Sequence, residues 1–263
     1  MRTEENGHSQ SPVKERLELI FSGQKKSMAV LLDPDKCGSG KKLMDFLNTC
    51  EENGVDLILV GGSLISGEGI KAVVEEVKHY SDLPVLLFPA HPTQICEQAD
   101  GILFLSLISG RQAEFLIGHH VVAAPVLART NLEVIPTGYL LIDGGKTTTA
   151  HYMSNSMPIP RDKADVAVAT ALAGKYLGMK LIYMDAGSGA LNPVPLEMIT
   201  EVKKHIQGPL IIGGGMRSPE QARAACLAGA DIVVIGNLLE EKPEMIQEMS
   251  IAIHAPISVT DKD

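Results

Sequence analysis

The feature that most constrains the fold is a series of eight short apolar segments spread along the chain. They occupy residues 28–32, 57–60, 84–88, 102–105, 134–142, 181–184, 209–212 and 231–235. Most are apolar at consecutive positions rather than at alternate ones, which indicates strands buried on both faces. Nearly all are followed by a segment of helical periodicity, so the chain predicts a parallel sheet covered by helices. These segments include a short helix at residues 111–117 and one final helix from about residue 238 to residue 251.

Eight strand–helix units predict an α/β fold of the TIM type, a (β/α)8 barrel. The chain has 263 residues, and barrels of about 250 residues fold as one domain. We therefore expect a single barrel domain over residues 13–263, preceded by a disordered tail at residues 1–12. An open doubly wound sheet is the alternative, but polar and glycine-rich residues follow nearly every strand rather than one switch point. Residues 150–160 form the one long irregular stretch and predict a mobile loop over the site.

Charge and composition exclude several classes of protein. The formal net charge is -9 at pH 7, and no block of Lys and Arg marks a surface for nucleic acid. The four cysteines lack a CxxC spacing and are expected to be free thiols in a reducing compartment. Because we find no signal peptide and no apolar run of ~18 residues, we expect a cytoplasmic protein with at most peripheral membrane contact.

In such a barrel the residues just after each strand line one face, and active sites lie there. Polar residues or glycines lie at or near the ends of all eight predicted strands: Asp33, Ser63, His91, Ser106, Tyr139, Asp185, Gly214 and Asn237. These residues are distant in sequence but are expected to be neighbours in space. The other histidines show no metal-ligand spacing, and we interpret His119, His120 and His151, like His91, as loop or surface residues.

Two glycine-rich loops predict a phosphate site. Gly213, Gly214 and Gly215 separate the seventh strand from a helix, and Gly236 and Asn237 follow the eighth strand. Glycine lets an anion approach the backbone, and N–H groups at a helix start carry partial positive charge. The loops after strands seven and eight are where these barrels often bind phosphate. The alternative is a pair of turns that bind nothing.

Two carboxylates have separate predicted roles. Asp33 ends the first strand in LLDPDK, and with the hydroxyl of Ser63 it could hold a hard cation such as Mg²⁺, which needs only one or two carboxylates beside substrate phosphates. Asp185 ends the sixth strand, and Gly187–Ser188–Gly189 follow it. A bound phosphate repels a nearby carboxylate, so such a carboxylate indicates a function, and accepting a proton or a hydrogen bond from a substrate hydroxyl is one. The alternatives are a turn residue at Asp33 and a capping residue at Asp185.

The ordered motifs resemble those of a known family. From residue 31 to residue 237 they read LLDPDK, VGGSLISG, FPAHPTQI, ADGILFLSLISGR, IPTGYLLIDGG, YMDAGSGA, IIGGGMRSPEQA and VVIGN. This series resembles the geranylgeranylglyceryl phosphate synthases, whose superfamily includes the heptaprenylglyceryl phosphate synthases. The resemblance implies a TIM-barrel prenyltransferase that joins sn-glycerol 1-phosphate to a polyprenyl diphosphate with Mg²⁺, and that forms homodimers or homohexamers.

The resemblance also implies roles for particular residues. Asp33 and Ser63 match the metal positions, and Asp185 matches an acid that is often Glu in the family. The glycerol-phosphate positions correspond to Tyr183, Met184, Asp185, Ala186, Gly187, Ser188, Gly189, Gly214, Gly215, Gly236 and Asn237. Leu31 stands where the heptaprenyl enzymes have Lys, which favours the geranylgeranyl type.

Other functions stay open at this level. Candidates for an apolar groove that holds the prenyl tail are Phe88, Phe104, Leu105, Tyr139 and Leu141, although barrel core explains each equally well. A different prenyl length is one alternative function. A sugar-phosphate isomerase that uses Asp33 and Asp185 as an acid–base pair is another, and a non-catalytic barrel that binds phosphorylated metabolites is a third.

Overall fold

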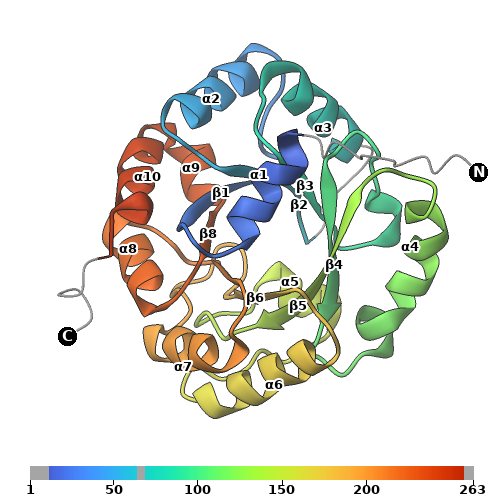
Figure 1. Ribbon diagram of the computed structural model, residues 1–263, viewed down its shortest axis with the longest axis vertical. Coiled ribbons are helices and arrows are strands. Elements are labelled where there is room, and N and C mark those ends of the chain that lie inside the picture. Colours follow the sequence, from blue (N-terminus) through green and yellow to red (C-terminus); the bar gives the residue numbers. More distant parts are fainter. Residues whose placement is uncertain (1–11, 64–68, 258–263) are drawn as a thin grey trace, which may run out of the picture.

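The computed structural model describes residues 12–63 and 69–257. The predicted tail lies outside these residues except for Pro12, the first residue of helix α1. Eight parallel strands pair in chain order and close into a barrel, because β8 returns to pair with β1 (Figure 1). The strands are β1 (Ser27–Leu32), β2 (Leu57–Gly61), β3 (Val85–Phe88), β4 (Gly101–Leu107), β5 (Glu133–Leu141), β6 (Leu181–Asp185), β7 (Leu210–Gly213) and β8 (Ile232–Ile235). The predicted (β/α)8 barrel is confirmed.

The described residues form helices, most of which surround the outer face of the barrel (Figure 1). They are α1 (Pro12–Phe21), α2 (Lys41–Glu52), α3 (Gly69–Tyr80), α4 (His119–Leu127), α5 (Thr149–Ser154), α6 (Ala164–Tyr176), α7 (Leu196–Ile206), α8 (Pro219–Ala228), α9 (Asn237–Glu241) and α10 (Ile246–His254). Single turns lie at Pro92–Gln94 (η1) and Pro243–Met245 (η3), and a π-helical turn at Glu114–Gly118 (η2) leads into α4. None of the helices in the described part of the chain is long and apolar enough to cross a membrane.

The strands are apolar at consecutive positions because the fold has two cores. Alternate side chains of each strand point to opposite faces. On β8, Ile232 and Val234 belong to the cluster inside the barrel, whereas Val233 and Ile235 belong to the cluster between the barrel and the helices. Helix α1 crosses the end of the barrel where the strands begin, and its Leu17 and Ile20 join the inner cluster (Figure 1). The candidate site lies at the opposite end of the barrel, where the strands finish.

Three predicted segments differ from the structure. Residues 150–160 were expected to be irregular, but α5 occupies their first part. A short helix was expected at residues 111–117, whereas the chain forms η2 and then α4 up to residue 127. The exposed valines of α4 leave it without a clear polar face, so the helical pattern is weak there. One final helix was expected from residue 238 to residue 251, but Pro243 has no N–H to donate and separates α9 from α10.

Candidate active site

A polar cavity of about 610 Å³ opens at the end of the barrel where the strands finish. Asp33 lines it after β1, and Gly214, Gly215, Gly236 and Asn237 line it after β7 and β8. The loop with the first carboxylate and the two glycine-rich loops therefore face a single cavity. The sequence-based prediction of a single site, with an anion-binding part and an acidic part, depends on this arrangement.

Backbone geometry explains the glycines of the β7 loop. Gly214 has φ 79°, in the left-handed region, and a Cβ atom there would lie 2.5 Å from both Asp185 Oδ1 and the Gly187 nitrogen. Gly215 has φ 72°, and a Cβ atom there would lie 2.6 Å from the carbonyl oxygen of Asn192. Any side chain would thus collide with backbone atoms or with the buried acid. The loop brings bare backbone to the cavity, as an anion site requires.

Further polar groups complete this side of the cavity. Ser188 Oγ donates to Asn237 Oδ1 at 3.2 Å, which joins the loops after β6 and β8. Arg217 lines the cavity as well, and its Nη2 donates to the carbonyl oxygen of Ala190 at 2.8 Å. The predicted site residues did not include Arg217 or Lys242, another lining residue. A cation directly after the glycine-rich loop was the signal that could have identified Arg217.

Asp185 is a buried carboxylate held by two donors. The Tyr139 hydroxyl donates to its Oδ2 at 2.5 Å, and the Gly187 N–H donates to its Oδ1 at 2.7 Å. Burial raises the pKa of Asp185 above its usual range, although both hydrogen bonds lower it. Burial and the charge of Asp185 also raise the pKa of the Tyr139 hydroxyl well above its ordinary value, so Tyr139 stays a donor. A carboxylate with a raised pKa is better matched to accept a proton near neutral pH.

Asp33 follows β1, the strand next to β8, and lies in a network of charges. Its Oδ2 is 2.5 Å from Lys36 Nζ, and its Oδ1 accepts the Asp35 N–H at 3.1 Å. The Asp33 N–H donates to Glu240 Oε1 at 3.0 Å, and burial raises the pKa of Glu240. Ser63 lines the same cavity. A carboxylate and a hydroxyl beside an anion site fit Mg²⁺, which prefers oxygen ligands and takes others from substrate phosphates. Within residues 12–63 and 69–257 no three His, Cys, Asp or Glu side chains form a metal cluster.

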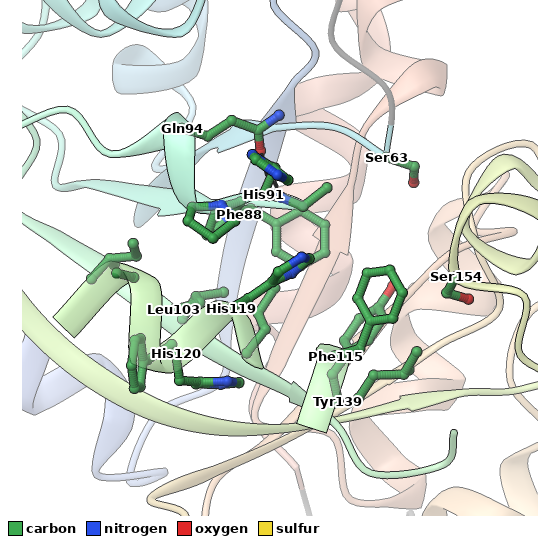
Figure 2. Close-up of a pocket in the computed structure, with 18 of the residues that line it drawn as sticks. Ser63, Phe88, His91, Gln94, Leu103, Phe115, His119, His120, Tyr139 and Ser154 are labelled. Carbon is green, nitrogen blue, oxygen red and sulfur yellow. Dashed lines mark hydrogen bonds between the residues drawn. The ribbon is translucent and has the colours of Figure 1, made fainter. Parts of the chain in front are cut away.

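A second cavity of about 480 Å³ adjoins the polar one and is mostly apolar (Figure 2). Gly62, Ser63 and Phe88 line both cavities. All five residues considered for an apolar groove line the second cavity: Phe88, Phe104, Leu105, Tyr139 and Leu141. In Figure 2 Ser63 lies at one side of this cavity and His120 at the opposite side. An elongated apolar ligand could therefore begin beside the polar cavity and extend away from it.

Three histidines line the apolar cavity, which sequence reasoning did not foresee. The rings of His91 and His119 are 5.2 Å apart, and His120 Nε2 lies 3.0 Å from Ser106 Oγ. Burial lowers the pKa values of His119 and His120, so both rings are neutral near pH 7 and compatible with an apolar ligand. The expectation of surface histidines is wrong for His120 and for His151, which are both buried.

The predicted site residues divide into two groups. Those that line the polar cavity are Asp33, Ser63, Tyr183, Asp185, Ser188, Gly189, Gly214, Gly215, Gly236 and Asn237. Met184, Ala186 and Gly187 do not line it. Met184 and Ala186 pack in the cluster between the barrel and the helices, because the strand alternation turns them outward. Gly187 contributes indirectly, through its hydrogen bond to Asp185.

Known proteins resemble the chain over most of its length. The model of the PcrB family matches residues 23–253. A geranylgeranylglyceryl phosphate synthase of Chitinophaga pinensis is 48% identical over 234 residues, which cover 89% of this chain and 92% of that protein. The protein of the same name from Thermococcus kodakarensis is 45% identical and covers 89% of this chain and 90% of its own length.

A solved structure matches both the fold and the sequence. It is the (S)-3-O-geranylgeranylglyceryl phosphate synthase of Thermoplasma acidophilum in complex with its substrate sn-glycerol-1-phosphate. The TM-score is 0.84 at 32% identity, and the match covers 94% of this chain and 100% of the solved chain. The similarity therefore extends to the strand ends that form the polar cavity.

Proposed function

This chain belongs to the PcrB family and is a prenyltransferase, and we propose that it joins sn-glycerol 1-phosphate to geranylgeranyl diphosphate. The reaction forms an ether at the 3-hydroxyl of glycerol phosphate and releases diphosphate. One observation carries the proposal: a polar cavity with a buried acid and glycine-rich loops meets an apolar cavity at Ser63 and Phe88. The names of the relatives and the substrate of the Thermoplasma enzyme support the same reaction.

We assign the phosphate of glycerol 1-phosphate to the loops after β7 and β8. Gly214, Gly215 and Gly236 offer close approach to backbone, and Arg217 adds positive charge at the same rim. Glycerol then extends toward Asp185, the buried acid of the cavity. Binding through the phosphate fixes the position of the hydroxyl, which reduces the entropy cost of the reaction.

The prenyl tail is assigned to the apolar cavity and the diphosphate to the junction with the polar one. The tail packs against the side chains shown in Figure 2, and Ser63 and Phe88 mark the junction. A sugar-phosphate isomerase is the weaker alternative, because a sugar phosphate makes no use of a large apolar cavity. Another prenyl length is consistent with the same geometry, and reaction with prenyl diphosphates of several lengths distinguishes the two.

A magnesium ion completes the proposal. Asp33 and Ser63 would hold it, with further oxygens from the diphosphate. When bound, Mg²⁺ draws charge from the departing diphosphate as a Lewis acid. The homo-oligomer and the cytoplasmic location expected from the sequence stay predictions.

The chemical step follows from the positions of the groups. The 3-hydroxyl oxygen forms a bond to C1 of the prenyl chain as the bond from C1 to the diphosphate oxygen breaks. The hydroxyl proton passes to a carboxylate oxygen of Asp185, which Tyr139 and Gly187 hold in place. Placement of the two substrates and neutralisation of charge supply much of the rate, and the base supplies the rest.

The direct test is a reaction with purified protein, sn-glycerol 1-phosphate, Mg²⁺ and labelled prenyl diphosphates of several lengths. We expect an ether product, formed fastest from geranylgeranyl diphosphate, and loss of product when EDTA removes the metal. A preference for another length would change the substrate but keep the reaction. Absence of any ether product contradicts the proposal, and activity that resists EDTA contradicts the role of Mg²⁺.

Tyr139→Phe should move the pH profile of the enzyme. Its hydroxyl lowers the pKa of Asp185 by donating to it, so its removal raises that pKa further. The acidic limb of kcat/KM should therefore shift to higher pH, with kcat about tenfold lower because a hydrogen bond to a charged group is lost. The measurement is kcat/KM between pH 5 and 9, with Tyr152→Phe at an exposed position as the control. An unshifted acidic limb would show that Tyr139 does not tune Asp185.

A further inference from the structure

The Lys36 side chain forms an ion pair with the carboxylate of Asp33, which is expected to bind the metal. Its Nζ lies 2.5 Å from Asp33 Oδ2, and both side chains line the polar cavity. Lys36 follows Asp33 by three residues in the DPDK turn, so the local chain brings the pair together. The ammonium thus competes for the oxygen that a cation would need.

Fold stability does not explain this pair. The Lys36 side chain is 51% exposed, and exposed ion pairs contribute little to stability. Lys203 offers a contrast, because it also lies 2.5 Å from a carboxylate, that of Asp231, whose side chain is only 2% exposed. The Asp231 carboxylate also accepts a hydrogen bond from the backbone N–H of Leu210 in β7, so the Lys203–Asp231 pair has a structural role. Lys36 instead faces a cavity, on a flexible four-carbon stem.

The other lining cations have different surroundings. Arg217, which follows β7, is held by the carbonyl oxygen of Ala190. Lys242 also lines the cavity. Among the described residues, however, the ion pairs at 4.0 Å or less include Lys36 and Lys203 but not Lys242. Lys36 therefore lies beside the expected positions of the metal and the diphosphate. Its partner, Asp33, is the residue that a metal ion would bind.

We propose that Lys36 is a diphosphate-binding residue that exchanges partners: it neutralises Asp33 before the substrate arrives and then donates to the diphosphate as the metal takes its place on Asp33. The inference rests on the proposed function, because it needs a diphosphate beside Asp33. An ammonium is a strong donor to phosphate oxygens, and it also offsets charge on the departing group. The exchange makes metal binding weak without diphosphate and strong with it.

The proposal predicts effects of opposite sign in the variant Lys36→Met. Mn²⁺ alone, as a spectroscopic substitute for Mg²⁺, should bind about fivefold more tightly, because a competing positive charge is gone. Inorganic pyrophosphate in the presence of Mg²⁺ should bind at least about tenfold more weakly, because a charged hydrogen bond is lost. The affinity for glycerol 1-phosphate should stay within about twofold, since the Lys36 ammonium pairs with Asp33 rather than with the loops assigned to the phosphate of that substrate.

The experiment measures Mn²⁺ binding by electron paramagnetic resonance and the two anions by calorimetry. Lys36→Arg, which keeps the charge, should retain most of the pyrophosphate affinity. Lys71→Met, at an exposed position of α3, is the matched control. Three outcomes would overturn the inference about Lys36 without contradicting the proposed function. They are unchanged pyrophosphate affinity, unchanged or weaker Mn²⁺ binding, and a loss of affinity confined to glycerol 1-phosphate. A parent protein that binds no pyrophosphate with Mg²⁺ contradicts the proposed function itself and, with it, this inference.

Discussion

Replacing Asp185 by Asn should lower kcat by about a hundred- to thousandfold while the affinity for glycerol 1-phosphate changes little. The amide has nearly the shape of the carboxylate, and its oxygen can still accept the Gly187 N–H. It cannot accept a proton from the substrate hydroxyl, and a positioned base contributes about 10²- to 10⁴-fold to a rate. The measurements are steady-state turnover and calorimetric binding of glycerol 1-phosphate.

Two further variants separate charge from shape at this position. Asp185→Glu restores the carboxylate on a longer stem and should recover part of the lost turnover. Asp162→Asn changes an exposed aspartate and should leave both quantities as they are. If Asp185→Asn lost binding and turnover together, the residue would be structural. Unchanged turnover would favour a barrel that binds phosphorylated metabolites without catalysis.

Asp33→Ala should lower turnover on the order of a thousandfold, because a Lewis acid at the leaving group contributes several kcal/mol. The affinity for glycerol 1-phosphate should stay largely intact. The loop that carries Asp33 neighbours the loop after β8, but the side chain and N–H of Asp33 contact Lys36, Asp35 and Glu240 rather than Gly214, Gly215 or Gly236. Calorimetry should show that Mg²⁺-dependent binding of pyrophosphate is lost while that of glycerol 1-phosphate persists.

The control for this variant is Asp82→Ala, an exposed aspartate outside both cavities. Thermal denaturation of both variants checks that the fold survives, and only small changes are expected at partly or fully exposed positions. Equal losses for pyrophosphate and glycerol 1-phosphate would show that the division of the cavity into two parts is wrong.

The arrangement of the strand ends could be predicted because a parallel barrel makes it a consequence of strand order. Once eight buried strands were recognised, the residues that follow them had to meet at one end. Asp33 and Gly214 illustrate this, since they lie 181 positions apart in the chain and both line one cavity. The glycines carried a local signal too, because only bare backbone tolerates the contacts at Gly214.

Features that depend on packing were not predictable in the same way. The hydrogen bond between Tyr139 and Asp185 joins neighbouring strands, and no local sequence pattern predicts it. His120 is buried because α4 folds onto the apolar cavity, and that helix lacks a clear apolar stripe. Met184 was assigned to the site by motif alone, although strand alternation points it to the outer core.

The aromatic wall at the junction of the two cavities has a consequence for by-products. Phe88 stacks on Tyr183 with ring centroids 5.4 Å apart, and it meets Tyr139 edge-on at 5.8 Å. An allylic carbon that loses its leaving group here faces π-electron density, which stabilises positive charge, instead of bulk solvent. Capture of that carbon by water, which would waste the donor as a free prenyl alcohol, is therefore disfavoured relative to ether formation.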